Sequence, residues 1–198
     1  MVTIQKSTLQ FLSDLKRHND KEWFNANRNR YEAARDNFET FVQAAINKIS
    51  LFDPILKGLE SKSCTYRINR DIRFSNDKTI YKTHLGAFVV RGGKRNGDRF
   101  AGYYIHVEPG NGMIAGGAYM PPSVWLSAIS EKIAHHGKEF LNITSDTDFI
   151  RFFGAIEGEK LKSAPKGYSR DHHYIELLKL KSFLSARLIS DSKMTSES

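Results

Sequence analysis

The chain has 198 residues, of which 40% are hydrophobic and 26% are charged. This composition is ordinary for a globular protein and excludes a disordered chain, and the length suits one domain with a single core. No apolar run reaches the ~18–20 residues that span a bilayer, and the first residues lack the apolar stretch of a secretory signal, so we expect no membrane partner. The only cysteine, Cys64, cannot form an internal disulfide, which favours a cytoplasmic location.

The net charge of +8 is concentrated in one part of the sequence. Residues 61–100 contain ten Lys or Arg and three Asp, whereas the flanking parts are close to neutral. Charge gathered in so short a stretch predicts a local positive potential and an anionic partner. The alternative is a solvated basic surface that has no partner.

The N-terminal quarter predicts two helices. Leucines recur near helical spacing over residues 7–18, and an apolar stripe at steps of three and four extends over residues 20–49. The two helices are separated by His18-Asn19-Asp20, where Asn19 stands three residues before Glu22 in a loose capping-box arrangement. We assign the aromatic residues of the long stripe to core packing.

The middle of the chain has the period-two alternation of strands. Strands are expected over residues 64–69, 84–91, 100–108 and 113–120, separated by turn-rich stretches. The connections are of hairpin length, which favours an antiparallel sheet. Tyr104, His106 and Glu108 share one face of the third strand, and we expect that face to be partly open.

The last third predicts helices over residues 123–140, 146–156 and 174–189, with a short strand at 160–162. Helices followed by clustered strands and then helices favour an α+β fold. We therefore predict a single α+β domain over residues 1–190, with an antiparallel sheet of about four to six strands flanked by N-terminal and C-terminal helices. Residues 191–198 lack an apolar anchor and are expected to form a disordered tail.

The densest polar segment is residues 67–84. Arg67, Asp71 and Arg73 occupy alternate positions together with Asn69, so an extended chain would point all four to one face. Guanidinium groups present forked donors that suit phosphate or carboxylate, and neighbouring aspartates can hold them in place. The predicted ligand-binding residues of this segment are Arg67, Arg70, Asp71, Arg73, Asp77, Lys78, Tyr81 and Lys82. The alternative is an internal salt-bridge network that fixes a hairpin, although exposed ion pairs contribute only ~0–1 kcal/mol each.

His106 and Glu108 are the first candidates for general acid–base catalysis, because they share a strand face beside the predicted basic pocket. They could also supply two metal ligands, with His84 or His172 as a third. No short zinc motif such as His-Glu-x-x-His accompanies them, and we predict no metal site.

Nucleotide-binding and nucleophile motifs are weakly represented. Gly92-Gly93-Lys94 lacks the spacing of a phosphate-binding loop, and no Gly-x-Gly-x-x-Gly stretch precedes a predicted helix. Cys64 opens a predicted strand, where a small buried residue is expected, and Ser75 has basic neighbours without an assigned base. The sequence therefore identifies no cofactor.

Three blocks of residues give the chain a family resemblance. They are Phe11-Leu12-x-x-Leu15 with Asn19-Asp20-Lys21-Glu22-Trp23-Phe24, Asn27-Arg28 and Tyr31; Arg70-Asp71-x-Arg73-Phe74-Ser75-x-Asp77-Lys78 with Tyr81-Lys82; and Pro165-Lys166-Gly167-Tyr168 with Asp171-His172 and Leu177-Leu178. In these blocks the chain resembles the domain of unknown function 2461 family of bacterial and fungal proteins, over nearly its whole length. It departs from the family pattern at Ile80 and His173, where proline is often found.

The resemblance implies one cytoplasmic α+β domain and no established activity. It also suggests that the second and third blocks meet in space. Lys166 and Tyr168 would then join Arg70, Arg73 and Lys82 around one cleft, which adds them to the predicted ligand-binding residues.

The leading hypothesis is a domain that binds a phosphorylated or otherwise anionic small molecule, and that acts as an enzyme if His106 and Glu108 exchange protons with it. The first alternative is a nucleic-acid-binding module, because Tyr81, Tyr103 and Tyr104 accompany the basic groups and aromatic rings can stack bases. The second is a structural or partner-binding domain whose polar segment only fixes a hairpin. The sequence does not indicate an oligomeric state.

Overall fold

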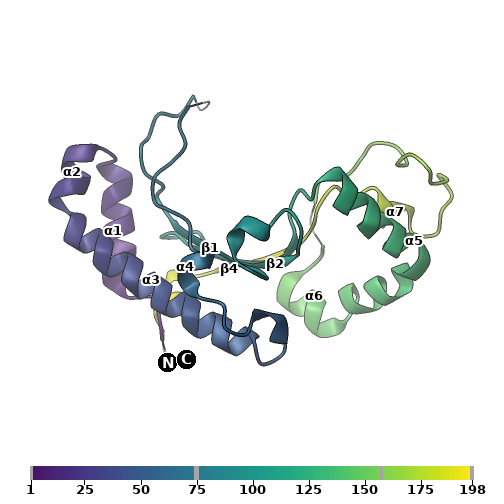
Figure 1. Ribbon diagram of the computed structural model, residues 1–198, viewed down its shortest axis with the longest axis horizontal. Helices are drawn as coiled ribbons and strands as arrows, with labels where there is room; N and C mark the ends of the chain where they lie inside the picture. The colour runs from purple at the N-terminus through teal and green to yellow at the C-terminus, as the bar shows by residue number, and fades with distance from the viewer. Residues whose placement is uncertain (1, 74–75, 157, 197–198) are drawn as a thin grey trace. The chain divides into compact units, whose positions relative to one another are not determined.

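The computed structural model describes residues 2–73, 76–156 and 158–196. Helices and one four-stranded antiparallel sheet make up the fold (Figure 1), which confirms the predicted α+β class. The chain divides into two compact units. The first comprises residues 1–96, 103–114 and 188–198, and the second comprises residues 97–102 and 115–187.

The first unit begins with three helices, α1 (Lys6–Arg17), α2 (Lys21–Ala26) and α3 (Arg28–Ile49). The prediction of one helix over residues 20–49 was therefore wrong at Asn27, where the backbone leaves the helical region with φ −109° and ψ 21°. The Asn27 side chain donates to the carbonyl of Trp23 at 2.9 Å and accepts from Arg30 at 3.0 Å. An asparagine that bonds to nearby groups in this way competes with the helical ladder. Asp20 caps α2 by accepting from the amide of Trp23 at 2.8 Å.

The core of the first unit lies between these helices and the apolar side of two strands. Strand β1 (Leu85–Val89) pairs with β2 (Gly102–Val107) in an antiparallel register that sets Leu85 opposite Val107. The buried apolar side chains occupy alternate positions, namely Leu85, Ala87 and Val89 on β1 and Ile105 and Val107 on β2, as expected for a sheet with one covered face. The most buried large side chains of this core are Ile4, Phe11, Leu12, Leu15, Phe38, Val42, Ile46, Leu56, Val89 and Val107.

Strands β3 (Gly112–Ala118) and β4 (Phe183–Ile189) complete the sheet in the order β1-β2-β3-β4. The helix predicted over residues 174–189 was wrong, because only α7 (Ile175–Leu178) is helical and the chain then enters β4. Phe183 and Ser185 are buried whereas Leu188 is exposed, which fits a strand with one buried face. The expected strand at 160–162 is reduced to a single bridge between Lys160 and Leu180.

The second unit contains α5 (Ser123–Thr144) and α6 (Thr147–Phe153) besides α7. Its core is formed by Ile133, Leu178, Leu180 and Phe183. Helix α5 is interrupted at His136, which has φ −130° and ψ 22°. The next residue, Gly137, lies so close to Tyr174 that an added Cβ would come within 2.6 Å of its ring. The missing side chain thus allows the loop after α6 to pack on α5.

The C-terminal segment expected to be disordered contains helix α8 (Asp191–Thr195). Met194 is only 8% exposed and its carbonyl accepts from the amide of Ile4 at 3.0 Å. The side chain of Ser190 caps the helix by accepting from the amide of Lys193 at 3.3 Å. None of the described helices is long and apolar enough to cross a membrane.

Candidate functional site

The basic segment forms an excursion between α4 (Ser61–Cys64) and β1, which we call the basic arm and define as residues 65–84. The strand expected over 64–69 is replaced by a helical turn that ends at Cys64 and by isolated bridges from Thr65 to Ala87 and from Asn69 to Tyr81. The amide of Arg70 donates to the carbonyl of Ile80 at 2.9 Å, so the two sides of the arm run antiparallel at its base. Figure 1 shows the arm as a long loop beside the N-terminal helices. Phe74 and Ser75, which belong to the second family block, lie outside the described residues.

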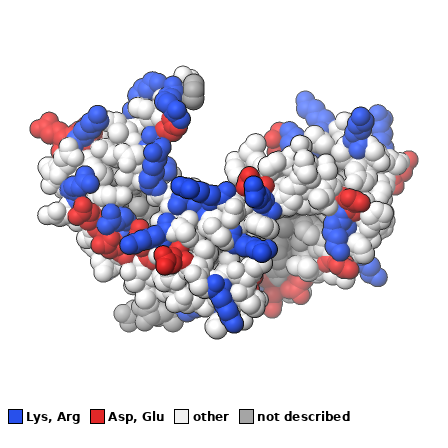
Figure 2. Space-filling model, viewed as in Figure 1, with Lys and Arg blue, Asp and Glu red and all other residues white. Residues whose placement is uncertain are grey.

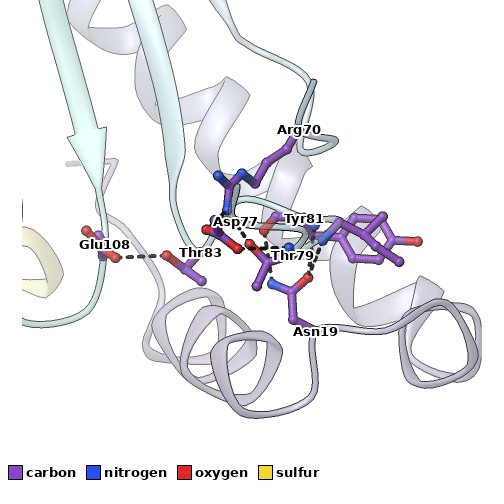
Figure 3. Close-up of polar contacts among 8 residues, drawn as sticks. Asn19, Arg70, Asp77, Thr79, Tyr81, Thr83 and Glu108 are labelled. Atoms are coloured by element: carbon purple, nitrogen blue, oxygen red, sulfur yellow. Dashed lines mark hydrogen bonds and ion pairs between the residues drawn. The ribbon is translucent and has the colours of Figure 1, made fainter. Parts of the chain in front are cut away.

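Two arginines of the basic arm, Arg70 and Arg73, are paired with carboxylates of the arm itself. Arg70 donates to the carboxylate of Asp77 and to the hydroxyl of Thr79 (Figure 3), and the hydrogen bond from Arg70 lowers the pKa of Asp77 from 3.8 to about 2. Arg73 makes a forked contact with Asp71, with Nε and Nη2 at 2.9 and 2.7 Å from its two oxygens. This pair lowers the pKa of the Asp71 carboxyl. Figure 2 shows Lys and Arg side chains gathered along the arm.

The two lysines of the basic arm contact backbone carbonyls. Lys78 Nζ donates to the carbonyl of Ile72 at 3.3 Å, and Lys82 Nζ donates to the carbonyl of Arg67 at 2.8 Å. The Lys82 ammonium also lies 5.5 Å from the centre of the Tyr66 ring. Burial lowers the pKa of Lys82, and the nearby Arg67 acts in the same direction.

Tyr81, a predicted ligand-binding residue, is part of the core. It is 6% exposed and its ring stacks on Phe24 with 4.0 Å between the ring centres. Asn19, from the turn between α1 and α2, hydrogen-bonds to the backbone of Ile80 and Tyr81 at 2.9–3.0 Å (Figure 3). The base of the basic arm is thereby attached to the N-terminal helices.

The polar side of the β1–β2 pair carries a continuous chain of hydrogen bonds. The Tyr104 hydroxyl lies 3.1 Å from His106 Nδ1, and His106 Nε2 lies 3.3 Å from Glu108 Oε2. Thr83 and Asn111 donate to the same carboxylate at 2.9 and 3.0 Å. Because the Glu108 carboxylate can only accept, the neutral imidazole carries its proton on Nε2 and donates it to Glu108. Its Nδ1 then accepts a hydrogen bond from the Tyr104 hydroxyl. Gly86 lies opposite His106 in the register, and its lack of a side chain leaves room for the Tyr104 hydroxyl, which an added Cβ would meet at 3.0 Å.

His84 adds a second imidazole to this side of the sheet. Its ring lies 4.3 Å from that of His106, centre to centre. Burial is the main cause that lowers the pKa of His84 from 6.5 to about 4; His106, Lys82 and Arg70 contribute in the same direction and Glu108 in the opposite one. His84 is therefore neutral at neutral pH. We call the set of His84, Tyr104, His106 and Glu108 the polar face.

The charge states on the polar face follow from the same contacts. Burial alone would raise the pKa of Glu108, but the hydrogen bonds from Asn111, Thr83 and His106 outweigh it and the pKa is lowered. Burial raises the pKa of Tyr104, and the Glu108 carboxylate adds to this effect. At neutral pH the face thus holds a carboxylate, a neutral phenol and a neutral His84.

The sequence groups His106 with Glu108, but it predicts His84 only as a metal ligand and Tyr104 only as a stacking ring, and it gives Thr83 no role. The alternation along β2 indicated Tyr104, whereas His84 is brought to His106 by the β1–β2 register, which no local pattern shows. Lys166 and Tyr168 belong to the second unit, where Tyr168 packs against the core and Lys166 is exposed. Their meeting with the basic arm stays a prediction.

No set of three His, Cys, Asp or Glu side chains among the described residues is arranged to hold a metal ion. His172, a predicted third ligand, accepts from the amide of Tyr174 through Nδ1 at 3.1 Å. Cys64 is buried, and burial raises the pKa of its thiol.

Comparison with known proteins agrees with the resemblance seen in the sequence. Residues 7–198 match the family described as "Conserved hypothetical protein (DUF2461)". Because this match covers essentially the whole chain, the chain belongs to that family. No curated protein and no solved structure matches it significantly.

Proposed function

We propose that this member of the family binds an anionic small molecule at the polar face and transfers a proton to or from it through His106 and Glu108. One observation carries the proposal. The His106 imidazole lies on strand β2 with its side chain 12% exposed, and it is hydrogen-bonded to Tyr104 on one side and to Glu108 on the other. A carboxylate that orients an imidazole in this way is the arrangement general acid–base catalysis uses.

The proton chemistry follows from the order of the hydrogen bonds. Glu108 fixes the tautomer of His106 and would stabilise the imidazolium if Nδ1 received a proton. The Tyr104 hydroxyl is the hydrogen-bond partner of Nδ1, so a proton that leaves the phenol can pass directly to His106. In this proposal Tyr104 exchanges the proton with the ligand, His106 accepts it, and Glu108 carries the balancing negative charge.

The positive charge for an anionic ligand comes from Lys82. This lysine and Arg70 both lower the pKa of His84, so their positive charges act on a member of the polar face. An ammonium group has three donors, and the one hydrogen bond that the Lys82 ammonium makes among the described residues uses one of them. Because Lys82 is half-buried, its charge is screened less than that of an exposed lysine.

The ion pairs of the basic arm favour the structural alternative for Arg70, Asp71, Arg73 and Asp77. Each of these side chains has an opposite charge within the arm, which is what a network that orders a loop requires. In our proposal these residues hold the conformation of the arm and do not contact the ligand. The anion is bound by Lys82 and the polar face. Exposed pairs of this kind contribute little to stability, so their main effect is on the conformation of the arm.

The test is thermal unfolding against phosphates, acidic metabolites, nucleotides and short oligonucleotides. A ligand at 100 times its dissociation constant stabilises the folded state by ~2.7 kcal/mol. We expect a small anion to raise the unfolding temperature of the wild type and of Lys57→Met, which removes an exposed lysine. Lys82→Met should abolish the shift. His106→Asn should keep binding and lose any turnover of the ligand.

Two outcomes would contradict the proposal. A ligand shift that survives in Lys82→Met would place the anion elsewhere. A response to oligonucleotides alone, falling steeply with salt, would favour the nucleic-acid alternative.

A further inference from the structure

The second unit contains a pocket that is unrelated to the polar face. It has a volume of about 310 Å³ and lies between the loop that follows residue 160 and helix α7. Lys162, Ser163, Ala164, Arg170, Ile175 and Lys179 line it. All of these residues belong to the same compact unit.

The walls of the pocket are fixed by backbone hydrogen bonds. The amide of Leu161 donates to the carbonyl of Lys179 at 2.8 Å, and Lys160 is bridged to Leu180. The other wall is a series of turns that leads into α7, in which the amide of Ile175 donates to the carbonyl of His172 at 2.9 Å. Lys162 and Lys179 are therefore held near each other by paired backbone, although they are 17 positions apart in the sequence.

The charge of the pocket is one-sided. Three of its six lining residues are cations, and none of the described residues that line it is acidic. Glu176 does not line the pocket, but its carboxylate lies 2.8 Å from Lys179 and 3.1 Å from Lys160, and these two lysines lower its pKa. Among the described residues, Lys162 and Arg170 have no carboxylate within 4.0 Å.

We propose that this pocket binds a small molecule through a phosphate or diphosphate group. The Arg170 guanidinium offers forked donors to phosphate oxygens, and the lysines add point charges. Ser163 supplies a hydroxyl donor and Ile175 an apolar wall, a mixture typical of small-ligand sites. A volume of about 310 Å³ is at the small end of the range for such sites, so it suits a compact group rather than a polymer.

The rest of the loop offers a matched control. Lys166 lies between Lys162 and Arg170 in the sequence and is also exposed, but it does not line the pocket. A diffuse basic surface would depend on Lys166 as much as on the other two. A site built from the pocket depends on Lys162 and Arg170 alone.

The experiment is calorimetric titration of the full chain with inorganic pyrophosphate, inorganic phosphate and a short single-stranded oligonucleotide, in dilute buffer without divalent metals. We expect one pyrophosphate to bind per chain, and Lys162→Gln or Arg170→Gln to weaken it at least about tenfold, since each removes charge-assisted hydrogen bonds. Lys166→Gln should change the dissociation constant less than about twofold. Unchanged thermal unfolding of each variant shows that it is folded.

The outcomes separate this site from the polar face. His106→Asn and Lys82→Met should keep the pyrophosphate affinity of the wild type, whatever they do to the ligand of the polar face. Absence of pyrophosphate binding to the wild type would overturn the proposal. An equal loss in Lys166→Gln, or tighter binding of the oligonucleotide than of pyrophosphate, would also overturn it in favour of a diffuse basic surface.

Discussion

Asn19 hydrogen-bonds to both backbone polar groups of Tyr81. Its Nδ2 donates to the Tyr81 carbonyl at 2.9 Å, and its Oδ1 accepts from the Tyr81 amide at 2.9 Å. The same oxygen accepts from the amide of Ile80 at 3.0 Å. A single amide side chain thus acts as a strand partner for the base of the basic arm. It couples the turn between α1 and α2 to a segment about sixty positions away.

Replacing Asn19 should destabilise the first unit. Asn19→Ala leaves the Tyr81 backbone groups without partners, and Asn19→Asp keeps an acceptor but loses the donor. A buried polar group that loses its partner costs ~1–3 kcal/mol, and we expect the free energy of unfolding in urea to fall by that amount in both variants. Asn29→Ala on α3, an exposed position, should change it by less than ~0.5 kcal/mol. Equal effects of Asn19→Ala and Asn29→Ala would contradict this role.

Tyr81 should stabilise the folded state through the packing of its ring and not through its hydroxyl. The ring is buried against Phe24, so Tyr81→Ala should lower the free energy of unfolding by ~3–5 kcal/mol, as for other buried aromatic residues. Tyr81→Phe keeps the stack and should cost less than ~1 kcal/mol. Urea unfolding of the two variants measures both values. A large loss in Tyr81→Phe would show that the hydroxyl has a partner or a ligand.

The elements that could be predicted are those with a strong periodic pattern and nearby partners. Helix α1 and strands β1 and β2 follow directly from the spacing of their buried residues. Strand β4 was missed because the apolar residues of 174–189 fit a helical stripe as well as a strand. Only its pairing with β3 distinguishes it from a helix, and the local sequence carries no information about that pairing.

The same distinction applies to the candidate site. The contact between Arg73 and Asp71 and the row of Tyr104, His106 and Glu108 involve residues two positions apart, so alternation along an extended chain indicates them. The contact of His84 with His106 depends on strand register. Asn19 was predicted to cap a helix, but Asp20 caps α2 and Asn19 is engaged with the arm. Nothing in the local pattern distinguishes these two roles.

Helix α8 should contribute to the stability of the first unit. Met194 is buried in the core of that unit and its backbone holds Ile4. Met194→Ala should lower the free energy of unfolding by ~2–4 kcal/mol, the usual cost of truncating a buried methionine. Lys193→Ala, at an exposed position of the same helix, should change it by less than ~0.5 kcal/mol. Equal stability of wild type and Met194→Ala in urea would mean that the segment is not packed in solution.

His84 should make the folded state sensitive to mild acid. Its pKa is lowered from 6.5 to about 4 on folding, so between these values the unfolded chain binds the proton that the folded protein rejects. The stability that the folded state gains from a neutral His84 is fully present above pH 6.5 and is lost as the pH falls towards 4.

At pH 5 this linkage should lower the free energy of unfolding by ~2 kcal/mol relative to pH 7.5. His84→Gln has no proton to bind, so it should lose most of this pH dependence, as urea unfolding at the two pH values would show. The lowered pKa values of Glu108 and Asp77 act in the same direction but at more acidic pH, because carboxyl groups in the unfolded chain titrate near 4. An equal loss of stability between pH 7.5 and 5 in wild type and His84→Gln would show that His84 is accessible to water and that the polar face is open.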